Sequence, residues 1–137
     1  MSSLNSYKEL ALLDYKGAIA LKELSLYNLS AKLYQQFVEK SLKHIIDCNQ
    51  LNSKPEDKQL LKTHNVLKLG LRVEEIINQK YDKNTLAWFR TVKDYYFEVS
   101  YPGDDFTEIT ESMILELADW VESFKSLVQQ QQQLQQQ

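Results

Sequence analysis

The chain has 137 residues, a size at which a single hydrophobic core is the default, and 43% of its residues are hydrophobic. Three glycines and two prolines are too few for the many tight turns of an all-β protein, whereas the helix-forming residues Leu, Lys, Glu, Gln and Ala dominate. One cysteine excludes an internal disulfide and a CxxC-type metal site, and the net charge of −3 argues against general nucleic-acid coating.

The first predicted helix covers residues 5–26, because small and apolar residues recur there at steps of three and four. Its predicted inner face consists of Leu10, Leu13, Gly17, Ala20 and Leu24. A glycine inside a helix costs roughly 1 kcal/mol relative to alanine. We therefore expect a neighbouring helix to approach closely at Gly17.

The second predicted helix covers residues 29–49, with Asn28 or Ser30 as its N-cap. Its predicted apolar stripe contains Leu33, Phe37, Ser41, His44 and Cys48, which makes Cys48 an inert core thiol. Its predicted polar side carries Gln35, Gln36, Glu39, Lys40 and Lys43.

The remaining helices are predicted over residues 57–78, over residues 84–99, and from Thr110 past Leu127. Prolines and turn-forming residues mark the loops, most strongly at residues 101–105. Short loops favour antiparallel neighbours, so the predicted fold is all-α, an up-and-down bundle of four or five helices over residues 1–128. The glutamine-rich segment 129–137 is predicted to be a disordered tail.

Two features of the sequence have both a structural and a functional interpretation. The aromatic run Tyr95, Tyr96, Phe97 and Tyr101 is typical of a core, or forms a stacking surface for a base or a second subunit. His64 falls on the inward stripe of its helix, where it either satisfies a hydrogen bond or works as a functional group.

Self-contained catalytic motifs are absent from the sequence. Neither His44 nor His64 has a glutamate three residues before it, so no di-iron or other protein-built metal site is predicted. There is no Gly-x-Ser-x-Gly elbow and no glycine-rich phosphate loop. A bound phosphate would need a helix N-terminus or side chains such as Lys40, Lys43 and Lys62.

Charge is unevenly distributed along the chain. Residues 32–72 contain eight Lys or Arg and four Asp or Glu, whereas residues 98–122 contain eight acids and no base. Solvated helix faces are one interpretation of both runs. The alternatives are an anion or nucleotide site on the basic half, or head-to-tail pairing of the unlike faces of two copies. With no signal sequence and no apolar run of about 20 residues, we expect a cytoplasmic protein without a membrane span.

Three segments together resemble the HEPN domain (higher eukaryotes and prokaryotes nucleotide-binding). Residues 35–43 resemble the family's Gln-Gln-x-x-Glu-Lys-x-Leu-Lys signature, and residues 63–69 resemble its Thr-His-(Asn/Asp)-Leu-x-x-Leu segment. Residues 101–104, followed by Ile109 and Thr110, resemble its Tyr-Pro-Gly-Asp…Ile-Thr run. The resemblance spans residues 5–127.

The resemblance implies a helical bundle that is commonly a homodimer and often has a small nucleotidyltransferase as its partner, as in toxin–antitoxin-like pairs. An RNA-cleaving branch of the family uses an Arg followed four to six residues later by His. Here both arginines, Arg72 and Arg90, follow both histidines, and Ser100 stands where many relatives have Arg. The resemblance therefore favours the non-nuclease branch.

The leading hypothesis is a non-catalytic binding module for a nucleotide, for a nucleotidyltransferase partner, or for both, with no catalytic residue and no metal. By resemblance, the expected contacts are Lys40, Lys43, His64 and Asn65, with Tyr101 and Asp104 shaping the rim. One alternative is an RNA-cleaving toxin with a different residue set. Another is a purely structural or adaptor dimer, in which Glu39 and Lys40 form an exposed pair and Asp104 only serves its turn.

Overall fold

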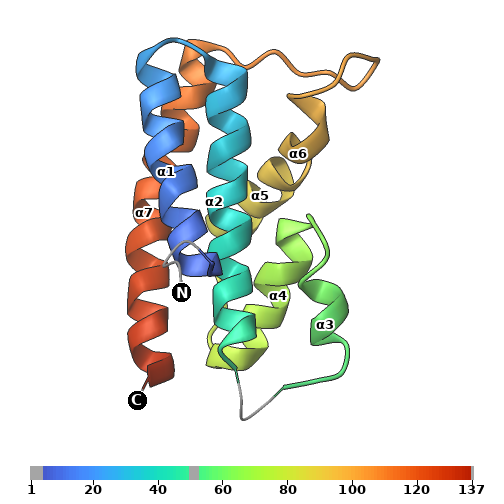
Figure 1. The fold of residues 1–137 in the computed structure, drawn as a ribbon, viewed down its shortest axis with the longest axis vertical. Coiled ribbons are helices and arrows are strands. Elements are labelled where there is room, and N and C mark those ends of the chain that lie inside the picture. Colours follow the sequence, from blue (N-terminus) through green and yellow to red (C-terminus); the bar gives the residue numbers. More distant parts are fainter. Residues whose placement is uncertain (1–4, 50–52, 137) are drawn as a thin grey trace.

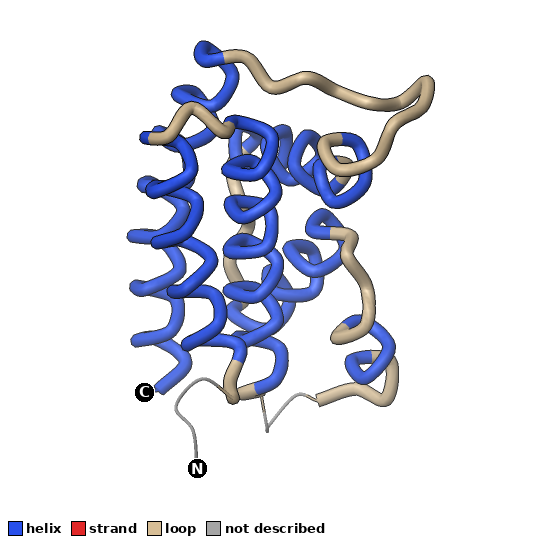
Figure 2. Tube along the Cα trace, turned by 45° about the horizontal axis from the view of Figure 1, so that its top comes forward, coloured by secondary structure: helices blue, strands red, loops and turns tan. Residues whose placement is uncertain are grey.

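The computed structural model describes residues 5–49 and 53–136, and this part of the chain contains helices and no strand (Figure 2). The predicted all-α class is confirmed. Residues 1–4 of the predicted domain and Gln137 of the predicted tail lie outside the described residues. The helices are α1 (Tyr7–Glu23), α2 (Tyr27–Asp47), α3 (Asp57–Leu60), α4 (Val66–Ile77), α5 (Lys83–Lys93), α6 (Tyr95–Glu98) and α7 (Glu111–Gln136).

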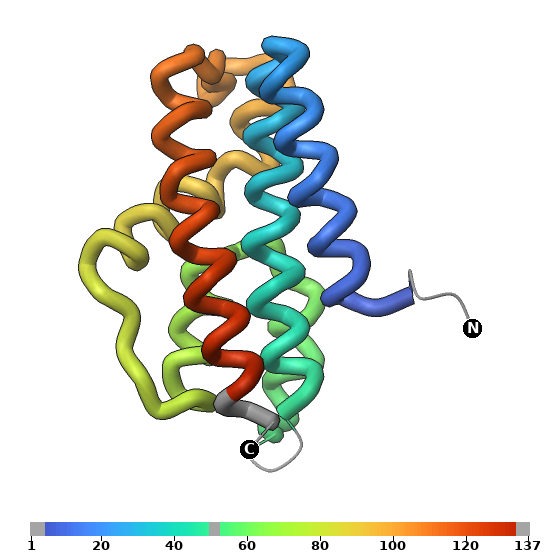
Figure 3. Tube along the Cα trace, turned by 90° about the vertical axis from the view of Figure 1, so that its left-hand side faces the viewer, coloured from blue at the N-terminus to red at the C-terminus, as the bar shows by residue number. Residues whose placement is uncertain are grey.

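The long helices α1, α2 and α7 run side by side, and the shorter helices α3 to α6 cover the other side of α2 (Figures 1 and 3). Helix α2 is therefore the centre of the bundle, and it packs against α1, α7, α4 and α6. Its buried apolar residues include Tyr34, Val38, Leu42 and Ile45. None of the helices in the described ranges has the length and apolar character needed to cross a membrane.

Apart from Gly17, the predicted inner face of α1 is wrong. Leu13 and Leu24 are 46% and 68% exposed, and the buried residues of this helix are Ala11 and Ala18. The helix is rotated because small residues let it lie close to α2. A Cβ on Gly17 would be 2.8 Å from Leu33 Cδ1, so the close approach predicted at Gly17 is confirmed.

Two predicted helices are each divided in two. The segment predicted as one helix over residues 57–78 is interrupted between α3 and α4, and the segment 84–99 is interrupted at Asp94 between α5 and α6. At the first break, the side chains of Thr63 and Asn65 accept hydrogen bonds from backbone N–H groups and replace the helical pattern. Both breaks change the direction of the chain. Residues at both breaks lie in one region, described below as the candidate site.

Asn28 lies in the first turn of α2 and is not its N-cap, since that position is Leu26. The Asn28 amide instead donates to the carbonyl oxygens of Val99 (3.0 Å) and Thr107 (2.9 Å), while its Oδ1 accepts from Ile109 N (2.8 Å). One side chain thus holds both ends of the loop between α6 and α7. The loop tip projects from the bundle, as Figure 1 shows.

Helix α7 extends through Gln136, where the sequence predicts a disordered tail from residue 129. The reason is a specific contact that composition does not reveal. Gln131 is 2% exposed and accepts a hydrogen bond from the Tyr81 hydroxyl at 3.0 Å, which fixes the helix against the α4–α5 connection. A glutamine-rich segment can therefore continue the helix beyond the buried Val128.

A buried ion pair fixes α3 to α4. Arg72 donates from Nε to Asp57 Oδ1 at 2.8 Å and from Nη2 to Asp57 Oδ2 at 3.1 Å. The Arg72 guanidinium holds the pKa of the Asp57 carboxyl below its ordinary value. This bidentate contact gives the short helix α3 a defined place beside the candidate site.

Asp57→Asn is expected to lower the free energy of unfolding by about 2 kcal/mol at pH 7, because hydrogen bonds to charged groups contribute about that much. The pKa of the Asp57 carboxyl is depressed in the folded state, so this stabilisation is present above its ordinary pKa, about 4. It is lost as pH falls through the folded-state pKa. Urea unfolding should show that the difference in free energy of unfolding between variant and wild type is smaller at pH 3 than at pH 7. The exposed Asp119→Asn is the control, and a constant difference would contradict the prediction.

Candidate functional site

The turn between α3 and α4 presents the first polar residues of the site. Thr63 Oγ1 accepts from Asn65 N at 3.1 Å, and Asn65 Oδ1 caps α4 by accepting from Lys68 N at 3.1 Å. His64 lies between these two residues, outside regular helix. The local sequence therefore ends one helix, starts another and leaves the imidazole at a helix N-terminus.

The imidazole of His64 is fixed by two contacts from other helices. Its Nδ1 lies 3.1 Å from Glu39 Oε1 on α2, and its ring stacks on Tyr96 of α6 with centroids 3.7 Å apart and planes inclined by 11°. The side chain is still 41% exposed. Lys32 supports Tyr96 in turn, with Nζ 3.9 Å from the ring centroid and 2.6 Å from the Tyr96 carbonyl oxygen. His64 is thus held in one orientation while part of it stays accessible.

Beneath His64 lies a buried polar network on α2. Glu39 is 3% exposed, and its Oε2 accepts from Lys43 Nζ at 3.1 Å. Its Oε1 also accepts from Gln35 Nε2 at 3.0 Å, and Gln35 Oε1 accepts from Gln36 Nε2 at 2.7 Å. The predicted polar side of this helix is therefore an interior surface, covered by the helices that pack on α2.

The two predicted lysine contacts lie away from His64's accessible side. Lys43 is 5% exposed and is paired with Glu39, whereas Lys40 is paired with Asp14 of α1 at 2.6 Å. The alternative in which Glu39 and Lys40 form an exposed pair is wrong, since Glu39 is buried and bonded to other residues. Burial raises the pKa of the Asp14 carboxyl, and the hydrogen bond from Lys40 opposes that rise.

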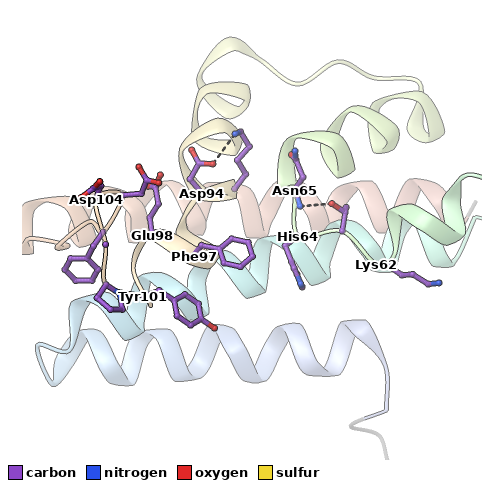
Figure 4. Close-up of a pocket in the computed structure, with 14 residues that line it drawn as sticks. Lys62, His64, Asn65, Asp94, Phe97, Glu98, Tyr101 and Asp104 are labelled. Atoms are coloured by element: carbon purple, nitrogen blue, oxygen red, sulfur yellow. Dashed lines mark hydrogen bonds and ion pairs between the residues drawn. The ribbon is translucent and has the colours of Figure 1, made fainter.

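A cavity of about 760 Å³ lies beside the α3–α4 turn (Figure 4). Its walls come from this turn, the end of α5, α6 and the tip of the α6–α7 loop. The lining residues are Lys62, Thr63, His64, Asn65, Lys93, Asp94, Phe97, Glu98 and residues 101–106. Four of the predicted site residues are thus brought together, namely His64, Asn65, Tyr101 and Asp104, and the two lysines Lys40 and Lys43 are not.

Exposed aromatic side chains form one wall of the cavity. Phe97 and Tyr101 are 59% and 57% exposed, with ring centroids 6.2 Å apart, and Phe106 is 48% exposed. Figure 4 shows Phe97 pointing toward the His64 end of the cavity. The sequence indicated this wall only through the aromatic run, in which Tyr95 is a core residue and Phe97 is not. Lys62, which the sequence offered as a phosphate ligand together with Lys40 and Lys43, is the one of these three lysines that lines the cavity. Lys93 and Glu98 had no distinguishing sequence signal as site residues.

Cys48 is an exposed residue at the C-cap of α2, so the prediction of a core position is wrong. Its Sγ lies 3.7 Å from His44 Nδ1. Partial burial raises the pKa of the Cys48 thiol and lowers the pKa of the His44 imidazole, which favours a neutral thiol beside a neutral ring. These directions oppose the lowered thiol pKa that an activated cysteine nucleophile requires. Within residues 5–49 and 53–136, no group of three or more His, Cys, Asp or Glu side chains is placed to hold a metal ion.

Comparison with known proteins gives one match. The chain matches the HEPN domain over residues 5–131, a range that contains every residue of the site described above. No curated protein and no solved structure matches it. Because the match covers most of the chain, and the fold is the helical bundle that the three sequence segments imply, this protein belongs to the HEPN domain family.

Proposed function

We propose that this chain is a non-catalytic HEPN module that binds a nucleotide in the cavity between the α3–α4 turn and the α6–α7 loop. One observation carries the proposal: exposed aromatic rings, Phe97 and Tyr101, line the same cavity as the fixed imidazole of His64. Aromatic side chains that remain exposed in a concave site are suited to stacking against a base. Polar groups beside them can then fix the ligand's orientation.

Each lining residue has a distinct role in this proposal. The base stacks on Phe97 and Tyr101, and His64 offers Nε2 to the ligand because Nδ1 is engaged by Glu39. Asn65 uses Oδ1 to cap α4, which leaves its amide N–H groups to donate to the ligand. Asp104 lies on the rim. Lys43 acts indirectly, since it stabilises the buried Glu39 that orients His64.

Phe97→Ala is expected to weaken nucleotide binding about tenfold, because loss of one stacking contact costs about 1–3 kcal/mol. His64→Ala is also expected to weaken it about tenfold, because it removes the hydrogen bond from Nε2, and a hydrogen bond to a charged group contributes about 1.5–3 kcal/mol. Isothermal titration calorimetry with adenosine and guanosine monophosphates measures this. His44→Ala is the matched control, a half-buried histidine on α2 that does not line the cavity. Unchanged affinity in both site variants would refute the site, and absence of binding to the wild type would refute the function.

The absence of a nuclease motif supports the non-catalytic part of the proposal. No histidine follows an arginine by four to six residues in this sequence, and Arg72 is committed to its buried pair with Asp57. The competing function is RNA cleavage with His64 as the acid–base group. It requires growth arrest on expression together with RNA cleavage that His64→Ala abolishes, and this combined result would exclude a purely binding role.

Family membership supports two further parts of the proposal, a homodimer and a small nucleotidyltransferase as partner. Light scattering after size-exclusion chromatography tests the dimer. Co-purification with a nucleotidyltransferase encoded beside this chain tests the partner. A tight homodimer with no nucleotide affinity would instead indicate a structural or adaptor role.

A further inference from the structure

The cavity has an uneven charge that bears on which nucleotides it accepts. Two lysines and four carboxylates line it, a formal charge of −2 with neutral His64. The carboxylates belong to Asp94, Glu98, Asp104 and Asp105. A site built to hold a polyphosphate has the opposite balance, with cations or several backbone N–H groups around the phosphates.

Fewer positive charges are available to a ligand than the number of lysines suggests. Lys93 Nζ lies 3.1 Å from Asp94 Oδ1, so its charge is largely matched within the wall. Lys40 and Lys43 are paired with Asp14 and Glu39 outside the cavity and supply nothing to it. Among the lining residues, Lys62 is therefore the main cation for a ligand.

The charges are also separated in space. Figure 4 shows Lys62, His64 and Asn65 at one end, and Glu98 and Asp104 at the other, with Phe97 between them. The N-terminus of α4, a helix of 12 residues, lies at the first end and adds partial positive charge there. This end can compensate one phosphate group. A longer phosphate chain would add charge that nothing in the lining compensates, while the carboxylates repel it.

We infer that this cavity, if it is the nucleotide site proposed above, selects a nucleoside or nucleoside monophosphate and rejects nucleoside di- and triphosphates. The inference rests on the proposed function and narrows it to a ligand class. The base occupies the aromatic wall, and the single phosphate occupies the end of the cavity formed by Lys62, His64 and Asn65.

Binding of adenosine, AMP and ATP, and of the guanosine series, tests this by calorimetry without divalent cations. ATP and GTP are expected to bind at least about tenfold more weakly than the monophosphates, because each uncompensated charge opposes several carboxylates. Raising the salt concentration should narrow this gap, since exposed charges are screened over about 10 Å at 0.1 M ionic strength. A gap that is independent of salt would overturn the electrostatic explanation.

The variant Glu98→Gln/Asp105→Asn is expected to raise the ratio of ATP to AMP affinity several-fold. Glu116→Gln/Asp119→Asn makes the same change of charge on α7 outside the cavity and should leave the ratio unchanged. Triphosphates that bind as tightly as monophosphates would overturn this inference and leave the proposed function standing. Binding of none of these compounds would overturn the proposed function itself.

Discussion

Lys43→Met is expected to lower the free energy of unfolding by about 4 kcal/mol, because it removes the cation from a buried carboxylate. The side chains of Lys43 and Glu39 are 6% and 3% exposed, so solvent cannot replace the lost charge. Methionine keeps most of the volume of lysine and leaves the helix propensity almost unchanged. The expected loss is therefore electrostatic, and urea unfolding at pH 7 measures it.

Lys40→Met is the matched control for this prediction, three residues earlier on the same helix. Its ion pair with Asp14 is partly exposed, at 22% and 17% for the two side chains, so we expect a loss of only about 1 kcal/mol. Adding Glu39→Gln to Lys43→Met should restore more than half of the lost stability, because the amide needs no counter-charge. A Lys43→Met variant as stable as Lys40→Met would show that Glu39 is not buried as described.

The same variants separate the contribution of this network to stability from its contribution to the orientation of His64. Glu39 accepts from Lys43 and also holds His64 Nδ1, so the double variant Lys43→Met/Glu39→Gln keeps the fold while altering the contact to the imidazole. If His64 contributes to nucleotide binding through its orientation, the double variant should bind more weakly than its recovered stability suggests. Calorimetry on samples shown to be folded by circular dichroism distinguishes this effect from unfolding.

The spacing of the network residues explains why the sequence did not predict that they are buried. Residues Gln35, Glu39 and Lys43 are spaced by four and lie on one face of a helix, which is the pattern of a solvated polar face. Only the packing of α4 and α6 on α2 makes that face interior. The contact between Glu39 and His64 joins residues 25 positions apart, and helix periodicity carries no information about such pairs.

Hydrophobic periodicity located the long helices, but it did not give the correct inner face of each of them. In α7, Leu117, Trp120 and Phe124 recur at steps of three and four and are all buried. In α1 the large leucines recur with helical spacing, yet the small residues Ala11 and Ala18 face the bundle, because close approach selects for size and not for hydrophobicity. Hydrophobic pattern therefore located the helix and gave the wrong orientation.

Sequence motifs located part of the candidate site, and backbone turns determined the rest. His64, Asn65, Tyr101 and Asp104 came from segments with a family signature, and all four line the cavity. Phe97 reaches the same cavity because the chain turns between α5 and α6, a break for which the sequence has no proline or glycine. Its exposure could only be recognised once this turn was seen.

Gly70→Ala is expected to lower the free energy of unfolding by about 3 kcal/mol, at the upper end of the usual cost of overpacking. A Cβ at this position would lie 2.4 Å from Phe89 Cε2 and 2.7 Å from Phe89 Cδ2. Phe89 is fully buried and its ring contacts Tyr81, Trp120 and Phe124, so it cannot turn away without moving the core. The roughly 1 kcal/mol that alanine gains in helix propensity is smaller than this cost. Thermal and urea unfolding measure the difference.

Gly17→Ala makes the same chemical change in α1 and is the control for this prediction. Its new Cβ would lie 2.8 Å from Leu33 Cδ1, the end of a flexible and only partly buried side chain that can change rotamer. Helix propensity then outweighs the small rearrangement, and stability should stay the same or rise by about 0.5 kcal/mol.

Adding Phe89→Leu to Gly70→Ala should cost less than Phe89→Leu costs alone, because the smaller side chain makes room for the methyl group. Equal stability of Gly70→Ala and Gly17→Ala would mean that α4 and α5 pack less closely than described, and the position of the site's α5–α6 wall relative to α4 would be wrong with it.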